Sequence, residues 1–176
     1  MKKLFLAVSG VFGVIPGVTI LLSGLLVPPG KKLLFGGVVE AFGALILVIL
    51  WANKNKLVKF SSAKATKLSI VFGILFFIFL VIYLILNSFC VVQHGTRGTV
   101  YYPLWTSGDL AGMVEKAGGR YAALDMYGID AVIEATHKSE ISLVLTTIIL
   151  LFVYQAVFST LTIAFGILGF RKRETL

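Results

Sequence analysis

Charged side chains are scarce in this sequence. Only 14% of the 176 residues are Asp, Glu, Lys or Arg, whereas a soluble domain usually carries about a quarter. Hydrophobic residues make up 58% of the chain, and the mean hydropathy is +0.97. The core of a protein this small cannot hide so much apolar surface from water, so we expect lipid to surround most of the chain.

Cysteine is almost missing as well, because Cys90 is the only one in the chain. An internal disulfide is therefore excluded, and any folded segment outside the membrane must be held together by packing. We interpret Cys90 as an apolar side chain that fills space near the end of a membrane helix. An intermolecular disulfide is the alternative.

The sequence lacks the motifs of nucleotide-binding and catalytic sites. Gly118-Gly119-Arg120 does not have the Gly-x-x-x-x-Gly-Lys pattern of a phosphate loop, and no nucleophile elbow is present. His94 and His137 bracket one polar segment of the chain. A metal site there would need further ligands, such as Glu140 or Asp109, and we favour two exposed boundary histidines instead. We expect no enzyme activity, no cofactor and no bound metal.

Four apolar runs dominate the rest of the sequence. Each reaches roughly the 20 residues that a helix needs to cross about 30 Å of hydrocarbon. The runs are Leu4–Val27, Leu33–Ala52, Leu68–Val92 and Ile141–Phe170. A helix satisfies its own backbone, as lipid requires, so we predict four transmembrane helices. The first run could also be a signal peptide, but it is long for one and no small-residue cleavage site follows it, so we expect it to be retained.

Positive charge is distributed unequally between the loops, and this distribution sets the orientation in the membrane. The more basic side would carry Lys2, Lys3, Lys54, Lys56, Lys59, Lys64, Lys67, Arg171, Lys172 and Arg173. The other side would carry Lys31, Lys32, Arg97, Lys116, Arg120 and Lys138, diluted by acidic residues. We therefore predict that both termini are cytoplasmic. The net charge of +8 then reflects topology and anionic lipid headgroups, and we expect no nucleic-acid partner.

The predicted fold is an all-α integral membrane protein with four transmembrane helices and a small, mainly helical extracytoplasmic cap between helices 3 and 4. Residues 1–92 would hold the first three helices, with a short outer turn at 28–32 and a basic cytoplasmic loop at 53–67. Residues 93–140 would form the cap, and residues 141–176 the fourth helix and a basic cytoplasmic tail. Because the cap is small, we expect it to rest on the outer ends of the helices.

Local signals within the cap predict its secondary structure. Thr99–Tyr102 has the composition of a strand. Thr106 and Asp109 have the spacing of a capping box, which predicts a helix that continues to about Ala117 and ends at Gly118.

A second cap helix should follow, with Tyr121–Tyr127 as its body and Gly128 as its end. Trp105 and Leu110 are placed for a hydrophobic staple at the start of the first cap helix. Trp105 and Arg97 also suit the boundary between membrane and water, where we expect the cap to lie.

Small residues mark the helix faces that we expect to contact other helices, since they let backbones approach closely in lipid. In the first helix they are Gly10, Gly13, Gly17 and Gly24. In the second helix, Gly36 and Gly43 share a face with Glu40. In the fourth helix, a stripe of polar and small residues consists of Gln155, Ser159, Thr162, Gly166 and Gly169.

Glu40 is the sharpest candidate for a functional residue, because a carboxylate within a membrane helix needs a partner, water or a proton. Other polar residues near its depth are Tyr83, Asn87 and Gln155, with Ser159 and Thr162 further inward. We hypothesise that they form or flank a polar path for an ion, a proton or a polar substrate. The alternative is a satisfied cluster of interhelical hydrogen bonds with a protonated Glu40.

Two classes of function fit this sequence. The first is a homo-oligomeric channel or pore-like protein, in which the path lies between copies because four short helices leave little room inside. The second is a non-catalytic accessory subunit or scaffold of a larger membrane complex. The expected partners are the lipid bilayer and either further copies of the chain or other membrane subunits.

Overall fold

The structure is a computed structural model that describes residues 27–28, 31–94 and 98–170 of the chain. The first predicted helix lies outside the described residues except for Val27, and with it lie Gly10, Gly13, Gly17 and Gly24. Arg97 and the basic tail from Arg171 to Arg173 also lie outside them.

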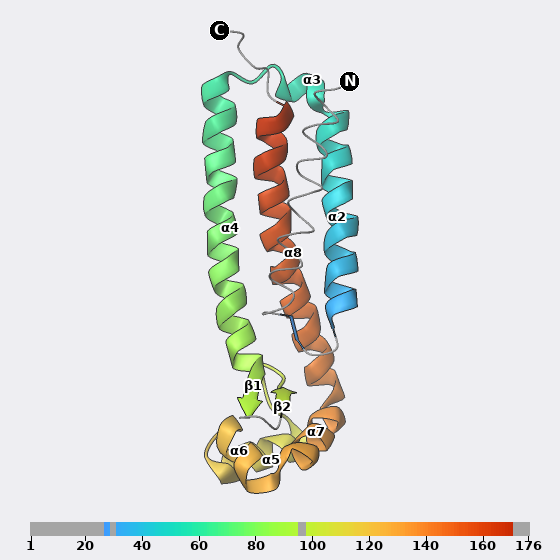
Figure 1. Ribbon diagram of the computed structural model, residues 1–176, viewed down its shortest axis with the longest axis vertical. Coiled ribbons are helices and arrows are strands. Elements are labelled where there is room, and N and C mark those ends of the chain that lie inside the picture. Colours follow the sequence, from blue (N-terminus) through green and yellow to red (C-terminus); the bar gives the residue numbers. More distant parts are fainter. Residues whose placement is uncertain (1–26, 29–30, 95–97, 171–176) are drawn as a thin grey trace.

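Three long apolar helices make up the body of the described chain (Figure 1). They are α2 (Lys32–Ala52), α4 (Ser62–Cys90) and α8 (Glu140–Phe170). Each is long and apolar enough to cross a membrane, which confirms the second, third and fourth predicted spans as helices of that kind. Because α8 packs against both α2 and α4 and lies between them in Figure 1, it is the central helix of the three.

The link between α2 and α4 contains less loop than the predicted stretch at 53–67. It includes the single-turn helix α3 (Lys54–Leu57), and α4 begins directly after Ser61. The Ser61 hydroxyl accepts a hydrogen bond from the Lys64 amide at 3.3 Å and so caps the first turn of α4. The predicted span began at Leu68, where the uninterrupted apolar run begins, whereas helix α4 already begins at Ser62.

Aromatic side chains fill the interior between the three helices, with Tyr154 of α8 at the centre. Its ring centroid lies 5.3 Å from that of Phe35 in α2 and 5.1 Å from that of Tyr83 in α4. The ring of Phe158, one turn further along α8, lies 4.9 Å away. All four side chains are buried. Rings at these separations attract one another and pack densely, so they close the middle of the described bundle.

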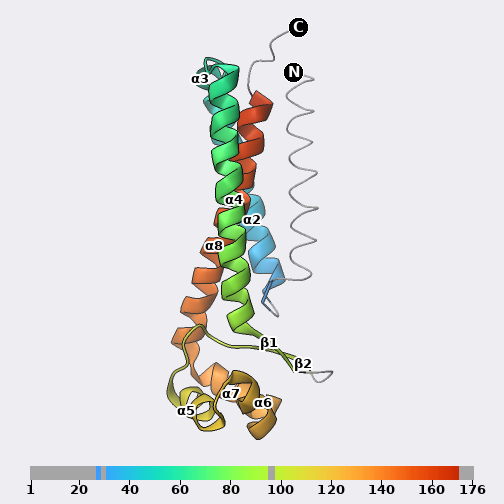
Figure 2. The same ribbon diagram turned by 90° about the vertical axis from the view of Figure 1, so that its left-hand side faces the viewer.

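A small lobe lies at one end of the bundle, between α4 and α8 in the chain (Figures 1 and 2). We call residues 91–139 the cap lobe. It consists of strands β1 (Val91–His94) and β2 (Gly98–Tyr101) and helices α5 (Gly108–Ala117), α6 (Arg120–Tyr127) and α7 (Ile129–Lys138). Its own buried core consists of Val100, Tyr102, Leu110, Leu124, Val132 and Ala135.

The two strands form an antiparallel hairpin, which corrects the all-α prediction. The strand expected at 99–102 is confirmed as β2, but its partner was expected to be helical up to Val92. Instead α4 ends at Cys90, and the β-branched Val91 and Val92 begin β1. The Tyr102 amide donates to the Cys90 carbonyl at 2.7 Å, so the hairpin satisfies a carbonyl that the end of the helix leaves free.

The helices of the cap lobe end where the glycines predicted, but α5 does not begin as predicted. Gly118 after α5 has a φ of 78° and Gly128 after α6 a φ of 81°, both in the left-handed region that favours glycine. The predicted capping box is wrong, because the N-cap residue of α5 is Ser107 and not Thr106, and no side chain bonds to the first turn. The Ser107 hydroxyl instead lies 3.1 Å from the Ser142 hydroxyl of α8 and links the lobe to the bundle.

Candidate functional site

Glu40 lies on the outside of the described bundle. The buried row of α2 consists of Phe35, Val39, Gly43 and Leu47. Glu40 follows Val39, so it lies about 100° further around the helix, and it is exposed. Gly36 is half-buried. The structure therefore does not bring Glu40 onto the packed face with Gly43, because the face that meets α8 follows the larger side chains.

The other polar candidates do not form one joined cluster. Tyr83 and Asn87 are buried on α4, and Tyr83 packs against Tyr154. The Asn87 Oδ1 atom has no hydrogen-bond partner among the described residues. Gln155 is half-buried, and its Nε2 donates to the Ser159 hydroxyl at 2.9 Å within α8. Tyr83 thus belongs to the aromatic interior, Asn87 is buried on the same helix, and Gln155 bonds along its own helix.

The remainder of the α8 stripe serves contacts within the chain. The Thr162 hydroxyl donates to the Phe158 carbonyl at 2.8 Å, which satisfies it inside the helix. Gly166 is buried against the side chain of Leu50 in α2, and Gly169 is exposed. Of these residues Gly166 packs α8 against α2, and the described part of the stripe forms no joined polar cluster.

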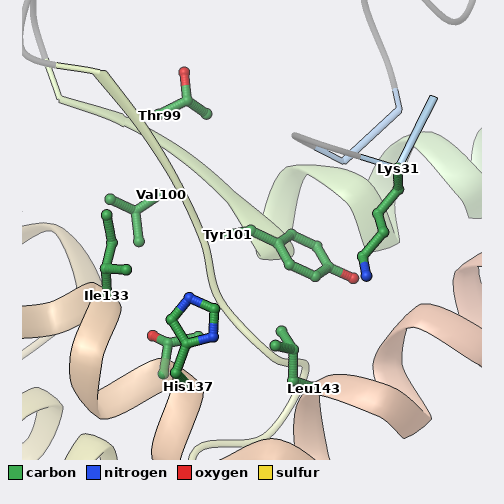
Figure 3. A pocket seen from close by; sticks show the side chains of 8 residues that line it. Lys31, Thr99, Val100, Tyr101, Ile133, His137 and Leu143 are labelled. Carbon is green, nitrogen blue, oxygen red and sulfur yellow. The ribbon is translucent and has the colours of Figure 1, made fainter. Parts of the chain in front are cut away.

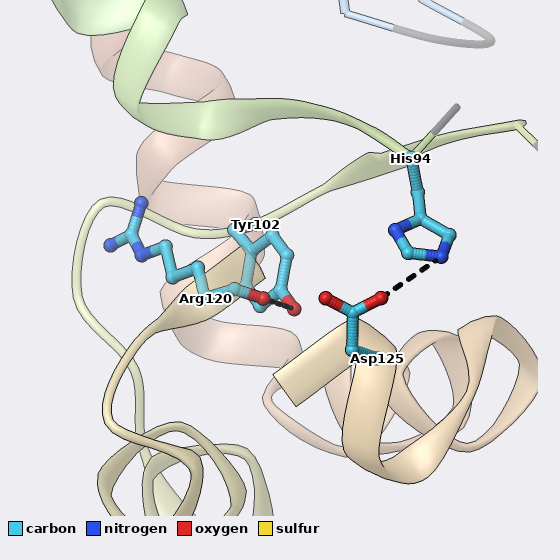
Figure 4. Close-up of polar contacts among 4 residues, drawn as sticks. All are labelled: His94, Tyr102, Arg120 and Asp125. Carbon is cyan, nitrogen blue, oxygen red and sulfur yellow. Dashed lines mark hydrogen bonds and ion pairs between the residues drawn. The ribbon is translucent and has the colours of Figure 1, made fainter. Parts of the chain in front are cut away.

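Arg120 ties the cap lobe to the end of α4 (Figure 4). Its guanidinium donates to the Phe89 carbonyl in the last turn of α4 and to the Leu104 carbonyl, the latter at 2.8 Å. The guanidinium lies 5.6 Å from the ring centroid of Tyr102, whose hydroxyl donates to the Arg120 carbonyl at 2.9 Å. Carbonyls in the last turn of a helix lack intrahelical partners, and a cation there also suits the helix dipole.

Burial at the junction between the lobe and the bundle changes the pKa values of its tyrosines. Burial raises the pKa of Tyr102 to about 12, although Arg120 opposes the change. Burial also raises the pKa of Tyr101 to about 12, against an opposing effect of the nearby Thr147 hydroxyl. A charged phenolate is therefore disfavoured at both positions.

A second set of bonds joins the lobe to α8. The Leu104 amide donates to the Thr146 hydroxyl at 2.9 Å, and the Ser139 hydroxyl donates to the Ser107 carbonyl at 2.9 Å. Reasoning from the sequence counted Arg120 only as a loop charge and missed these contacts. No local signal points to them, since the partners lie far apart in the chain.

The two histidines have different neighbours. His94 is buried, and its Nε2 lies 3.5 Å from Oδ1 of Asp125 (Figure 4). Its ring centroid lies 5.5 Å from that of Tyr121. Its Nδ1 has no hydrogen-bond partner in the described chain. His137 is exposed on α7. Within residues 31–94 and 98–170, no group of three or more His, Cys, Asp or Glu side chains is arranged to hold a metal ion.

The remaining cap candidates lie at or near the surface of the lobe. Trp105 and Asp109 are exposed, and Thr106 is half-buried. Cys90 is buried and unpaired, at the point where α4 meets the lobe. Its burial agrees with the interpretation of this side chain as a small apolar filler.

A pocket of about 330 Å³ lies where the cap lobe meets the bundle (Figure 3). Its walls come from Lys31 just before α2, from β2, from α7 and from Leu143 in the first turns of α8. Figure 3 shows the Lys31 amine directed toward the Tyr101 hydroxyl. Sequence analysis did not find this pocket, because four separate segments build it.

Three apolar helices of membrane-spanning length and a small lobe bonded to the ends of α4 and α8 define a helical membrane protein with a compact α/β lobe. No protein-family model, no curated protein and no solved structure matches the chain. Its function therefore has to be inferred from its own geometry.

Proposed function

We propose that this chain is a non-catalytic subunit or scaffold of a larger membrane complex, with both termini in the cytoplasm and the cap lobe outside. The observation that supports this proposal is the exposed Glu40 on a helix of membrane-spanning length. From Lys32 to Glu40 the helix axis advances about 12 Å, which places the carboxylate well inside the hydrocarbon of a spanning helix. A partner helix that donates a hydrogen bond would relieve the cost of exposing this group to lipid, about 2.5–3.5 kcal/mol for charged residues at a helix centre.

The surface around Glu40 suits a second helix. Gly37 and Ala41 are exposed beside it and lie one turn apart. Small residues at this spacing allow two backbones to approach closely in lipid, where close packing and hydrogen bonds drive association. We call Gly37, Glu40 and Ala41 the Glu40 face, and we propose it as the contact with another membrane subunit.

The cap lobe would present a fixed surface outside the membrane. Arg120 holds it to α4, and Thr146 and Ser142 hold it to α8. A lobe bonded to two helices keeps one orientation relative to them, as a scaffold that positions a partner requires.

A homo-oligomeric channel is the second candidate, and the same exposed Glu40 favours it. In a ring of copies, the Glu40 faces would gather several carboxylates around a common axis and attract cations. The path would lie between copies, since aromatic rings close the described interior of each copy.

Thiol-specific cross-linking in native membranes tests both candidates. In a Cys90→Ala background, the chain with Ala41→Cys presents a thiol on the Glu40 face, and we expect it to be cross-linked to a partner helix by a short reagent that joins this thiol to another thiol or to an amine. Val81→Cys is the matched control, because Val81 is exposed on α4 at a similar distance from the lobe end of the bundle.

The mass of the cross-linked product separates the outcomes. A product with a different protein supports the subunit proposal, and a product of twice the chain's mass supports self-assembly, to be followed by ion flux measurements in liposomes. Glu40→Leu should reduce either product, because it removes the hydrogen-bonding group. Equal cross-linking at Ala41→Cys and Val81→Cys, or none at either, would contradict the proposal.

A further inference from the structure

The pocket between the cap lobe and the bundle has one positively charged end. The Lys31 amine points toward the Tyr101 hydroxyl in Figure 3, and the His137 imidazole lies on the facing wall. Among the described residues Lys31 makes no ion pair, and the pocket lining contains no Asp or Glu. The nearby Glu134 of α7 is engaged by Lys138 at 2.9 Å. The charge of Lys31 is thus available to a bound anion.

The Tyr101 hydroxyl is a second polar group in the pocket wall, and the Thr147 hydroxyl of α8 lies near it. Its oxygen is buried and makes no hydrogen bond within the described chain. The neighbouring Thr147 hydroxyl donates to the Leu143 carbonyl at 2.9 Å. Buried hydroxyls nearly always have a partner, so the Tyr101 phenol is a donor that a bound acceptor in the pocket can use.

Apolar side chains form much of the remaining wall, namely Val100 of β2, Ile133 of α7 and Leu143 of α8, and Thr99 and Thr136 complete the lining. The pocket volume of about 330 Å³ is in the range of small-molecule sites. Since Lys31 precedes α2 and Leu143 lies near the start of α8, the pocket is level with the ends of two membrane-length helices, where lipid headgroups lie.

We propose that this pocket binds a phosphate group, with Lys31 as its countercharge and the Tyr101 hydroxyl and the His137 imidazole N–H as hydrogen-bond donors. A phosphate offers several acceptor oxygens, which matches three donors from three different elements. The phosphate can come from a phospholipid headgroup, whose acyl chains would contact the apolar walls, or from free phosphate in solution. The proposal does not depend on the assembly inferred from the Glu40 face.

Binding to the purified full-length chain in a neutral detergent tests this site. The probes are phosphatidylglycerol, its phosphate-free counterpart diacylglycerol, and inorganic phosphate, and the readouts are native mass spectrometry and the shift in unfolding temperature. We expect Lys31→Gln to weaken binding of phosphatidylglycerol about tenfold, the effect of losing one charge-assisted hydrogen bond. Lys32→Gln is the matched control, since Lys32 is the exposed neighbour outside the pocket and the substitution removes the same charge.

Tyr101→Phe provides a second variant that keeps the aromatic ring and the packing of β2. We expect it to weaken binding about threefold without a change in helix content, because only the hydroxyl is removed. This variant keeps the proposal testable if Lys31→Gln fails to fold.

The probes also identify the source of the phosphate. Competition between inorganic phosphate and phosphatidylglycerol supports one phosphate site open to both, and binding of inorganic phosphate alone supports a site for the free anion. Equal losses for Lys31→Gln and Lys32→Gln would overturn the proposal, since they would indicate general surface charge. It would also be overturned if inorganic phosphate did not bind and phosphatidylglycerol bound no more tightly than diacylglycerol.

Discussion

At the scale of single residues, Arg120 governs how firmly the cap lobe is held. Its planar guanidinium bonds to two separate carbonyls, those of Phe89 and Leu104. Arg120→Lys keeps the charge but cannot reproduce this fork, so we expect the free energy of unfolding to fall by about 1–3 kcal/mol. Thermal unfolding measures the effect. The exposed Lys116→Ala on α5 is the control and should change stability by less than about 0.5 kcal/mol.

Because of the two buried tyrosines at the junction, we expect alkaline pH to destabilise the contact between the cap lobe and the bundle. Burial raises the pKa of both Tyr101 and Tyr102 from the ordinary value of 10.0 to about 12. The folded protein therefore keeps these protons over a range in which the unfolded chain loses them. Their contribution to stability is complete below about pH 10 and is lost as the pH rises toward 12. Unfolding temperatures recorded from neutral pH upward should therefore decrease between about pH 10 and about pH 12.

Tyr102→Phe isolates one of the two phenols. At neutral pH the variant should be less stable by about 1 kcal/mol, because it loses the bond to the Arg120 carbonyl. Above pH 10 its stability should fall less steeply than that of the unsubstituted chain, since one titrating group is gone. Parallel pH curves for the two proteins would show that ionisation of Tyr102 does not limit the stability of the lobe.

The role of a single residue could be predicted from the sequence where that role depends on the conformation of the local backbone alone. Gly118 and Gly128 end their helices because a left-handed residue favours glycine wherever the rest of the chain lies. The outward position of Glu40 could not be predicted in this way. The small residues Gly36 and Gly43 indicated one face of α2, but Phe35 and Val39 fill the space beside α8 and turn Glu40 outward.

At the scale of elements, Gly166 controls the approach of α8 to α2. A side chain at this position would overlap that of Leu50. We expect Gly166→Leu to destabilise the fold by about 1–3 kcal/mol, the usual cost of overpacking. Gly169→Leu makes the same change at an exposed position of the same helix and should have little effect. Unfolding in mixed micelles measures both, and equal effects would contradict close α2–α8 packing at Gly166.

The long helices could be predicted because membrane-length apolar runs have few other solutions. Only one of the two strands of the hairpin, β2, could be predicted. Val91 and Val92 read as the end of an apolar run, and their strand conformation depends on pairing with residues of β2, with Val91 opposite Tyr101. The start of α5 was misplaced for a similar reason, since Ser107 bonds to Ser142 of a distant helix.

At the scale of the whole molecule, the distribution of Lys and Arg predicts the orientation. A membrane-impermeant amine reagent should label Lys116 in intact cells, whereas Lys59 should react only after permeabilisation. Both side chains are exposed, so access to the compartment decides the result. Peptide mass spectrometry identifies the labelled lysine. Labelling of Lys59 alone in intact cells would invert the topology and place the lobe in the cytoplasm.

The candidate sites were the least predictable part of the molecule. The phosphate pocket combines Lys31, Tyr101 and His137, which no spacing in the sequence connects. The aromatic centre around Tyr154 likewise joins three helices. Composition and periodicity indicate which residues are unusual, but only the packing of the elements determines which of them meet.

The central helix α8 has a mechanical consequence for the lobe. It is 31 residues long, about 46 Å if straight, which exceeds the hydrocarbon thickness and requires either a tilt or a protruding end. The first turns of α8 carry Ser142 and Thr146, which are bonded to the lobe. A thicker bilayer would reduce the tilt of α8, and the cap lobe would rotate with the helix because it is bonded to the end of α8.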